Sequence, residues 1–168
     1  MRFAPPAAAL SLVLAVTASA GWADTREPSP RAAVLIAQGE AALEAGNTQA
    51  ANDAFEAALV ADPGYTPLFL HLAETARRDE MQGKAIRYYR EALDRDPGNL
   101  AAIAGEGEAL AEKGAVEKAR QTLAKVTSLC GDACPESREL AAAIAAGPRV
   151  PVQTASIVLP EEQPAQSN

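Results

Sequence analysis

The chain has 168 residues, and its 15 basic and 22 acidic side chains give a formal net charge of −7 at neutral pH. This negative balance argues against nucleic acid or an anionic membrane surface as the main partner. The single histidine, His71, excludes a histidine-based catalytic triad or a multi-histidine metal site within one chain.

Residues 1–23 have the pattern of a secretory signal peptide. Arg2 gives a short positive start, Ala7 to Val16 form an apolar run, and Ala18-Ser19-Ala20 fits the small-residue cleavage pattern. Gly21-Trp22-Ala23 is a second cleavage site of the same kind. An uncleaved membrane anchor is the disfavoured alternative, because the apolar run is shorter than the ~20 residues that a spanning helix needs. We therefore expect a periplasmic or secreted protein with no stable membrane insertion after processing.

One phrase then recurs at a fixed spacing. Asp62-Pro63-Gly64 and Asp96-Pro97-Gly98 lie 34 residues apart, and each follows a stripe of apolar residues at helical spacing. The residue before a proline avoids the helical conformation, so each phrase is predicted to end a helix. A period of this length is typical of stacked helical hairpins. The predicted units are about 32–65, 66–99 and 100–131.

Turn and capping residues divide these units further. Gly46 and Gly114 each interrupt an apolar stripe, which predicts that a helix ends there. Asn47, Thr66 and Asn99 stand where the next helix begins, and side chains of these types commonly cap helix N-termini. We therefore expect two helices in each unit.

The units resemble the tetratricopeptide repeat family at six positions each. The first unit supplies Leu35, Gly39, Ala51, Phe55, Ala58 and Pro63. The second supplies Phe69, Ala73, Ala85, Tyr89, Ala92 and Pro97. The third supplies Ile103, Gly107, Ala119, Leu123 and Val126, with Gly131 in place of the proline. The resemblance implies an all-α, right-handed α-solenoid of three helix-turn-helix units. In it, small residues let the paired helices approach and the aromatic residue fills the gap to the next unit.

A capping helix is predicted to follow the third unit. Pro135 opens a helix over 135–146 that would cover the exposed face of the third unit, as solenoid ends require. The repeat domain then spans 31–146. The polar, proline-bearing residues 24–30 before it and the proline-rich residues 147–168 after it are expected to be disordered. The small apolar island Ile157-Val158-Leu159 in that tail is interpreted as incidental rather than as a docking motif.

Cys130 and Cys134 lie just before the predicted capping helix. In an exported protein such a pair predicts a structural disulfide, which would join this helix to the third unit. Because the loop is short, the chain-entropy model gives only about 2 kcal/mol of stabilisation. A redox-active pair is the disfavoured alternative, since the spacing is C-x3-C rather than C-x-x-C. Haem attachment would need a histidine where Pro135 stands, and a zinc site would lack ligands.

The resemblance also implies where a partner would bind. In tetratricopeptide arrays the first helix of each unit lines a concave groove that holds a partner segment. By position, the groove residues here are Ile36, Glu40, Leu43, Leu70, Glu74, Arg77, Arg78 and Glu108, with Glu44, Ala104 and Glu112 beside them. Chaperone-binding members hold a C-terminal carboxylate with lysine and asparagine at the positions of Ile36 and Glu40, so that function is not expected here. The lining fits a segment with apolar anchors and some basic charge; the alternative is a face that is only solvated.

The sequence thus indicates a binding scaffold rather than an enzyme. No catalytic residue, metal site or cofactor is predicted, and His71 is interpreted as a packing or surface residue. We expect non-catalytic binding of another cell-envelope protein in the groove. A self-associating structural scaffold, or an accessory factor of pilus or secretion assembly, is the alternative; an enzyme or redox factor is disfavoured.

Overall fold

The structure is a computed structural model that describes residues 26–149. The predicted signal peptide and residues 150–168 of the predicted tail lie outside the described residues. Within 26–149 there is no strand, and none of the helices is both long and apolar enough to cross a membrane. The helices are α1 (Pro30–Glu44), α2 (Thr48–Ala61), α3 (Pro67–Arg78), α4 (Gln82–Arg95), α5 (Leu100–Glu112), α6 (Val116–Cys130) and α7 (Pro135–Ala146).

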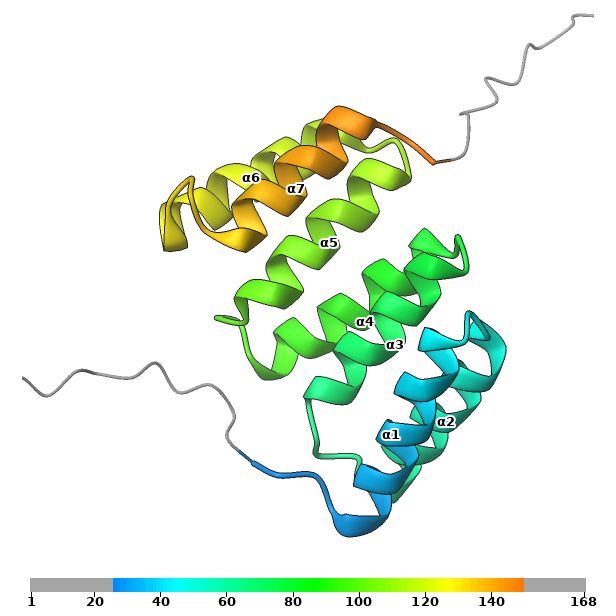
Figure 1. Cartoon of the computed structure of the whole chain (residues 1–168). Helices are drawn as coiled ribbons and strands as arrows, with labels where there is room; N and C mark the ends of the chain where they lie inside the picture. The colour runs from blue at the N-terminus through cyan, green and yellow to red at the C-terminus, as the bar shows by residue number, and fades with distance from the viewer. Residues whose placement is uncertain (1–25, 150–168) are drawn as a thin grey trace, which may run out of the picture.

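Consecutive helices pair into hairpins that stack in chain order (Figure 1). α1 packs on α2, α3 on α4, and α5 on α6, and the hairpins meet through α2 against α3 and α4 against α5. α7 packs against both α5 and α6 at the end of the stack. This arrangement confirms the predicted all-α solenoid of three helical hairpins followed by a further helix.

Most helix ends have the residues that the sequence predicts for them. The side chains of Asn47 and Asn99 each accept a backbone N–H of the helix that follows, at 3.0 and 2.9 Å. Gly46 and Gly114, with φ of 74° and 89°, follow α1 and α5 in the left-handed region that favours glycine. The prediction that Thr66 caps α3 is wrong, because its backbone is already helical (φ −53°, ψ −38°) and its side chain accepts no capping bond. An N-cap side chain needs a non-helical backbone to reach the first N–H groups.

Glycines make room for the large aromatic side chains of the core. Phe55 of α2 is fully buried, and a Cβ on Gly39 of α1 would lie only 2.5 Å from its ring. Tyr89 of α4, 4% exposed, packs equally closely against Gly105 of the next hairpin. Tyr89 therefore links the second unit to the third, which is the role predicted for it.

The segment before α1 has defined contacts. Ser29 caps α1 by accepting the backbone N–H of Ala32 at 3.3 Å. Asp62, the first residue of the first Asp-Pro-Gly phrase, is only 4% exposed; it pairs with Arg26 at 2.7 Å and accepts the backbone N–H of Ser29 at 2.9 Å. The prediction of a disordered lead-in is therefore wrong for residues 26–30, because a buried carboxylate holds them against the end of α2.

The first residues after α7 are also held in place. The backbone N–H of Arg149 donates to the carbonyl of Glu112 at 3.1 Å, and its guanidinium pairs with the Glu112 carboxylate at 2.9 Å. The same guanidinium lies 3.4 Å from the carbonyl of Arg77. The predicted disordered tail is therefore wrong for residues 147–149, which return to the ends of α5 and α3.

Candidate functional site

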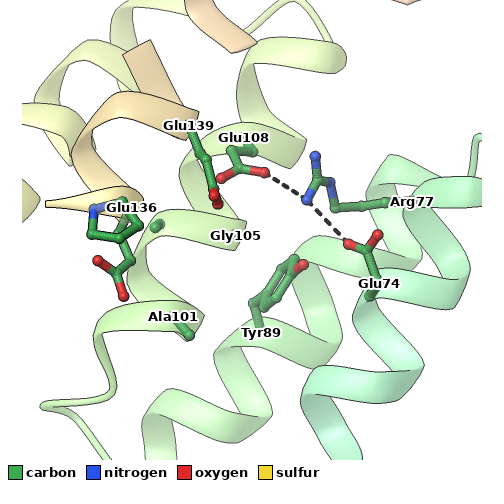
Figure 2. A pocket seen from close by; sticks show the side chains of 10 residues that line it. Glu74, Arg77, Tyr89, Ala101, Gly105, Glu108, Glu136 and Glu139 are labelled. Atoms are coloured by element: carbon green, nitrogen blue, oxygen red, sulfur yellow. Dashed lines mark hydrogen bonds and ion pairs between the residues drawn. The ribbon is translucent and has the colours of Figure 1, made fainter. Parts of the chain in front are cut away.

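A hollow of about 340 Å³ lies between α3, α5 and α7, with α4 beneath it. We call this hollow the acidic groove. Its lining is Glu74 and Arg77 of α3, Tyr89 of α4, Ala101, Ala104, Gly105 and Glu108 of α5, and Pro135, Glu136 and Glu139 of α7. Figure 2 shows the carboxylates of α3, α5 and α7 gathered around this space. Of the predicted groove residues, the structure brings Glu74, Arg77 and Glu108 together here.

Arg77 is the one cation in the lining of the acidic groove, and carboxylates surround it. Its guanidinium lies 3.2 Å from Glu74, 2.7 Å from Glu108 and 2.6 Å from Glu112 (the first two are dashed in Figure 2). Arg77 and Glu108 are 12% and 13% exposed, and Glu112 only 5%. These are charge-assisted hydrogen bonds in a largely dry setting, where such bonds are strong.

The Arg77 cluster leaves little cationic capacity for a ligand. Arg149 pairs with Glu112 from outside the groove, and Arg78 pairs with Glu74 at 3.0 Å. Arg78 does not line the groove. Arg77 therefore joins α3 to α5, a structural role that the sequence alone does not predict. Because Arg77 and Arg78 are both paired with carboxylates of the protein, neither of them is free to hold a ligand carboxylate.

Two carboxylates of α7 have no cationic partner among the described residues. Among the residues that the structure describes, Glu136 and Glu139 form no ion pair. Burial raises the pKa of the Glu108 carboxyl; Arg77 acts in the opposite direction, while Glu139 and Glu74 raise it further. A carboxylate whose pKa is raised by neighbouring carboxylates is stabilised in its charged form when a cation enters. The groove therefore favours a positively charged group.

Tyr89 forms the floor of the groove. Burial raises the pKa of its phenol to about 12, although the neighbouring Arg77 acts to lower it. The hydroxyl points toward Glu74 and Arg77 in Figure 2. A neutral phenol at the floor offers a hydrogen-bonding group without adding charge.

The other predicted groove residues lie elsewhere. Ile36 does not line the acidic groove; it is only 8% exposed and packs in the core of the first hairpin. Leu43 and Leu70 are half-buried against the core and do not line the groove. Glu40 lies 4.0 Å from His71.

His71 is a packing residue, one of the two roles that the sequence predicts for it. It stacks on Phe55 with ring centroids 4.9 Å apart. Burial lowers the pKa of the imidazole, and Glu40 acts in the opposite direction. The neutral ring is therefore part of the packing between the first two hairpins.

Several groove residues are missing from the sequence-based set. Glu136 and Glu139 were assigned only to the capping helix, yet α7 occupies the place that a fourth unit would take and adds its own carboxylates to the groove. Glu136 and Glu139 are three residues apart in the helix that Pro135 opens, so they share one helix face. This spacing is the sequence signal that could have identified them. Gly105 and Tyr89, which pack against each other, also line the groove.

The two cysteines hold the beginning of α7. Cys130, the last residue of α6, and Cys134, which precedes α7, form a disulfide with their Cα atoms 5.9 Å apart. Glu136 lies close enough to complete a group of three metal-ligand atoms within 4.8 Å. With both sulfurs in the disulfide, however, no thiolate is available to a metal ion. The bridge therefore serves to fix the end of α7 that carries Pro135 and Glu136.

Comparison with known proteins fits this geometry. Residues 83–144 match the model of the tetratricopeptide repeat family. The match covers α4 to α7 almost entirely, and the whole described chain has the fold of tetratricopeptide repeats. No curated protein matches its sequence.

Solved tetratricopeptide domains share the fold at low sequence identity. The first such domain of Spaghetti (RPAP3), bound to the HSP90 peptide SRMEEVD, has a TM-score of 0.62 and 22% identity; the match covers 71% of this chain and 98% of that one. The Yersinia enterocolitica type III secretion chaperone SycD, in complex with a peptide of the translocator YopD, has a TM-score of 0.61 and 21% identity, covering 70% and 92%. An O-GlcNAc transferase mutant from Thermobaculum terrenum has a TM-score of 0.61 and 22% identity, covering 71% of this chain but 23% of that enzyme.

Proposed function

We propose that this protein binds an extended segment of another protein in the acidic groove, with a lysine or arginine of that segment between α5 and α7. The observation that carries the proposal is the charge of the groove, whose lining holds four carboxylates and one guanidinium. That guanidinium is already paired with Glu74, Glu108 and Glu112. A basic side chain would thus meet uncompensated negative charge.

The similar structures support a peptide ligand but suggest a different charge. RPAP3 domains are solved with the peptides SRMEEVD and SGPTIEEVD, which are acidic. An acidic segment of that kind would be repelled by Glu108, Glu136 and Glu139. The buried Ile36 and the acidic Glu40 also replace the lysine and asparagine expected of a carboxylate-binding member. The proposed ligand is therefore a peptide segment, as in those complexes, and differs from those peptides in charge.

Apolar contacts would accompany the basic residue. Ala101 and Ala104 line the acidic groove beside its carboxylates. Small side chains there leave room for an apolar group of the ligand next to its charged end. We therefore expect a segment in which lysine or arginine alternates with apolar residues.

The proposed place of action is the cell envelope, and the proposed partner is another envelope protein. This part of the proposal is based on the signal-peptide pattern of residues 1–23. Intact-mass measurement of the protein made in its own cells tests it. A chain that begins near Gly21 or Asp24 is expected, and a full-length chain recovered from the cytosol or membrane would contradict export.

One alternative has support of its own. The acidic groove lies on the same molecule as a basic pocket lined by Arg90, Lys113 and Lys118. Opposite charges on two faces could pair copies head to tail, as a self-associating scaffold requires. Molar mass in solution at rising protein concentration distinguishes this alternative, since binding of a foreign segment leaves the protein monomeric.

Selection from a library of short random displayed peptides tests the groove. The retained peptides should be enriched in lysine and arginine, and their affinity should fall by about tenfold, roughly 1.4 kcal/mol, in the variant Glu136→Lys with Glu139→Lys. These two side chains take part in no ion pair of the described structure, so their reversal should leave the fold intact.

A second variant with two reversed charges outside the groove serves as the control for the peptide-binding experiment. Asp94→Lys with Asp132→Lys changes two exposed carboxylates that do not line the groove. This control should bind the selected peptides as the native protein does. Selection of acidic or uncharged peptides, or equal losses in the two variants, would overturn the proposal.

A further inference from the structure

A second hollow with the opposite charge lies on another side of the molecule. It has a volume of about 500 Å³ and runs between α4, the α5–α6 turn and the start of α6. We call it the basic pocket. Its lining is Ile86, Arg90, Leu110, Lys113, Gly114, Ala115 and Lys118.

The cations of the basic pocket are poorly compensated. Within the described part of the chain, Lys113 and Lys118 have no carboxylate partner, and Arg90 has one, Glu106 at 2.7 Å. No side chain caps the N-terminus of α6 at Ala115, which leaves partial positive charge there, and Glu117 in the same turn is paired with Arg120 at 2.7 Å. Three cations around one hollow are unexpected in a chain with a net charge of −7. An acidic occupant would compensate them.

The base of the pocket is apolar. Ile86 and Leu110 are 7% and 8% exposed, and both reach the hollow from the core. A neighbouring hollow of about 320 Å³ continues along the same turn, from Gly114 to Lys118. The pocket thus suits a segment that has an apolar part followed by acidic residues.

The chain itself carries such a segment beyond the last described residue. Ile157-Val158-Leu159 is followed by Pro160 and by Glu161-Glu162. Arg149, the last described residue, is bonded through its backbone and its guanidinium to Glu112. Glu112 adjoins Lys113, the first residue of the α5–α6 turn in the pocket lining. Residues 150–156 could extend by up to about 25 Å from there. The distance and the charges therefore both favour an occupant from the same chain.

We propose that residues 157–162 dock in cis in the basic pocket, with the apolar residues against Ile86 and Leu110 and the two glutamates near Lys113 and Lys118. The interpretation of Ile157-Val158-Leu159 as incidental would then be wrong. Docking would place the tail on a face different from the acidic groove, so the groove stays open to a partner.

Charge-swap variants of the full chain test this proposal. Hydrogen exchange of the backbone amides of residues 114–118 should become roughly fivefold faster when Glu161 and Glu162 are both changed to lysine, since two exposed ion pairs are lost. Lys113→Glu with Lys118→Glu should have the same effect. Combining all four substitutions should restore slow exchange, because the charges are again complementary.

The control is Lys125→Glu with Arg138→Glu, two exposed cations outside the pocket, which should leave exchange of residues 114–118 unchanged. The tail variant alters no described residue, so it stays informative even if the pocket variant misfolds. Equal exchange in the native chain and the tail variant would overturn docking. Protection that rises with protein concentration would show docking between copies and would overturn the cis arrangement.

Discussion

At the scale of single residues, Arg77 connects stability and function. It lies at the C-terminal end of α3, 35 residues before Glu112, and pairs with carboxylates of both α3 and α5. Removing one partner from a buried ion pair leaves an uncompensated charge, which costs far more than the pair contributes. Arg77 is therefore required for the fold as well as for the shape of the groove.

Arg77→Met should lower the free energy of unfolding by about 3–5 kcal/mol, because the largely buried Glu108 loses its cation and Glu112 keeps only Arg149. Arg78→Met should lower it by less than about 1 kcal/mol, since the pair of Arg78 with Glu74 is exposed. Urea unfolding of both variants provides the comparison. Equal losses would show that the Arg77 cluster does not join the helices.

The raised pKa of Tyr89 predicts that the stability of the folded protein depends on pH in the alkaline range. An unfolded tyrosine ionises near pH 10, whereas the folded protein raises the pKa of Tyr89 to about 12. The unfolded chain therefore loses this proton first, and stability should fall as the pH rises from about 10 to about 12. Tyrosinate absorbance should include one late-titrating component. If Tyr89→Phe retains that component, the assignment to Tyr89 is wrong.

At the scale of helices, α7 does more than cover the last hairpin. Its Leu140 is fully buried, and a Cβ on Gly107 of α5 would lie 2.8 Å from the Leu140 side chain. The disulfide fixes its first turn, where Pro135 and Glu136 meet the groove. The capping helix is thus one wall of the candidate site.

Cys134→Ser should loosen this wall locally. The chain-entropy model gives about 2 kcal/mol for so short a loop, so amides of α7 should exchange at most roughly thirtyfold faster. Helices α1 and α2 should exchange as before, since solenoid units depend mainly on their neighbours. Faster exchange across all helices would contradict a local role for the bridge.

Local signals predict the helices better than they predict the site. The paired Asp-Pro-Gly phrases, the caps at Asn47 and Asn99 and the aromatic Tyr89 depend on nearby residues or on the repeat period, and the structure has them as expected. The pairing of Arg77 with Glu112 and the return of Arg149 to α5 depend on contacts across the fold, which no local pattern encodes. The role of Glu136 and Glu139 depends on how α7 is rotated against α5, so the acidic charge of the groove follows only from the structure.

At the scale of the whole molecule, two charged hollows lie on different sides of one small solenoid. The acidic groove is built by the first helices of successive units and by α7, and the basic pocket lies near the α5–α6 turn. Their opposite charges would direct a basic partner and the acidic tail to separate places. The protein could therefore hold its own tail and a partner segment at the same time.

The most direct test of this account is to map where a selected basic peptide binds on the native protein. Amide chemical shifts, recorded while the peptide is titrated to saturation, locate the contact residue by residue. The account predicts the largest changes at Glu74, Glu108 and Glu139 and their neighbours on α3, α5 and α7, and weaker binding as salt is added. Changes confined to α2 and α6, or affinity that does not depend on salt, would contradict it.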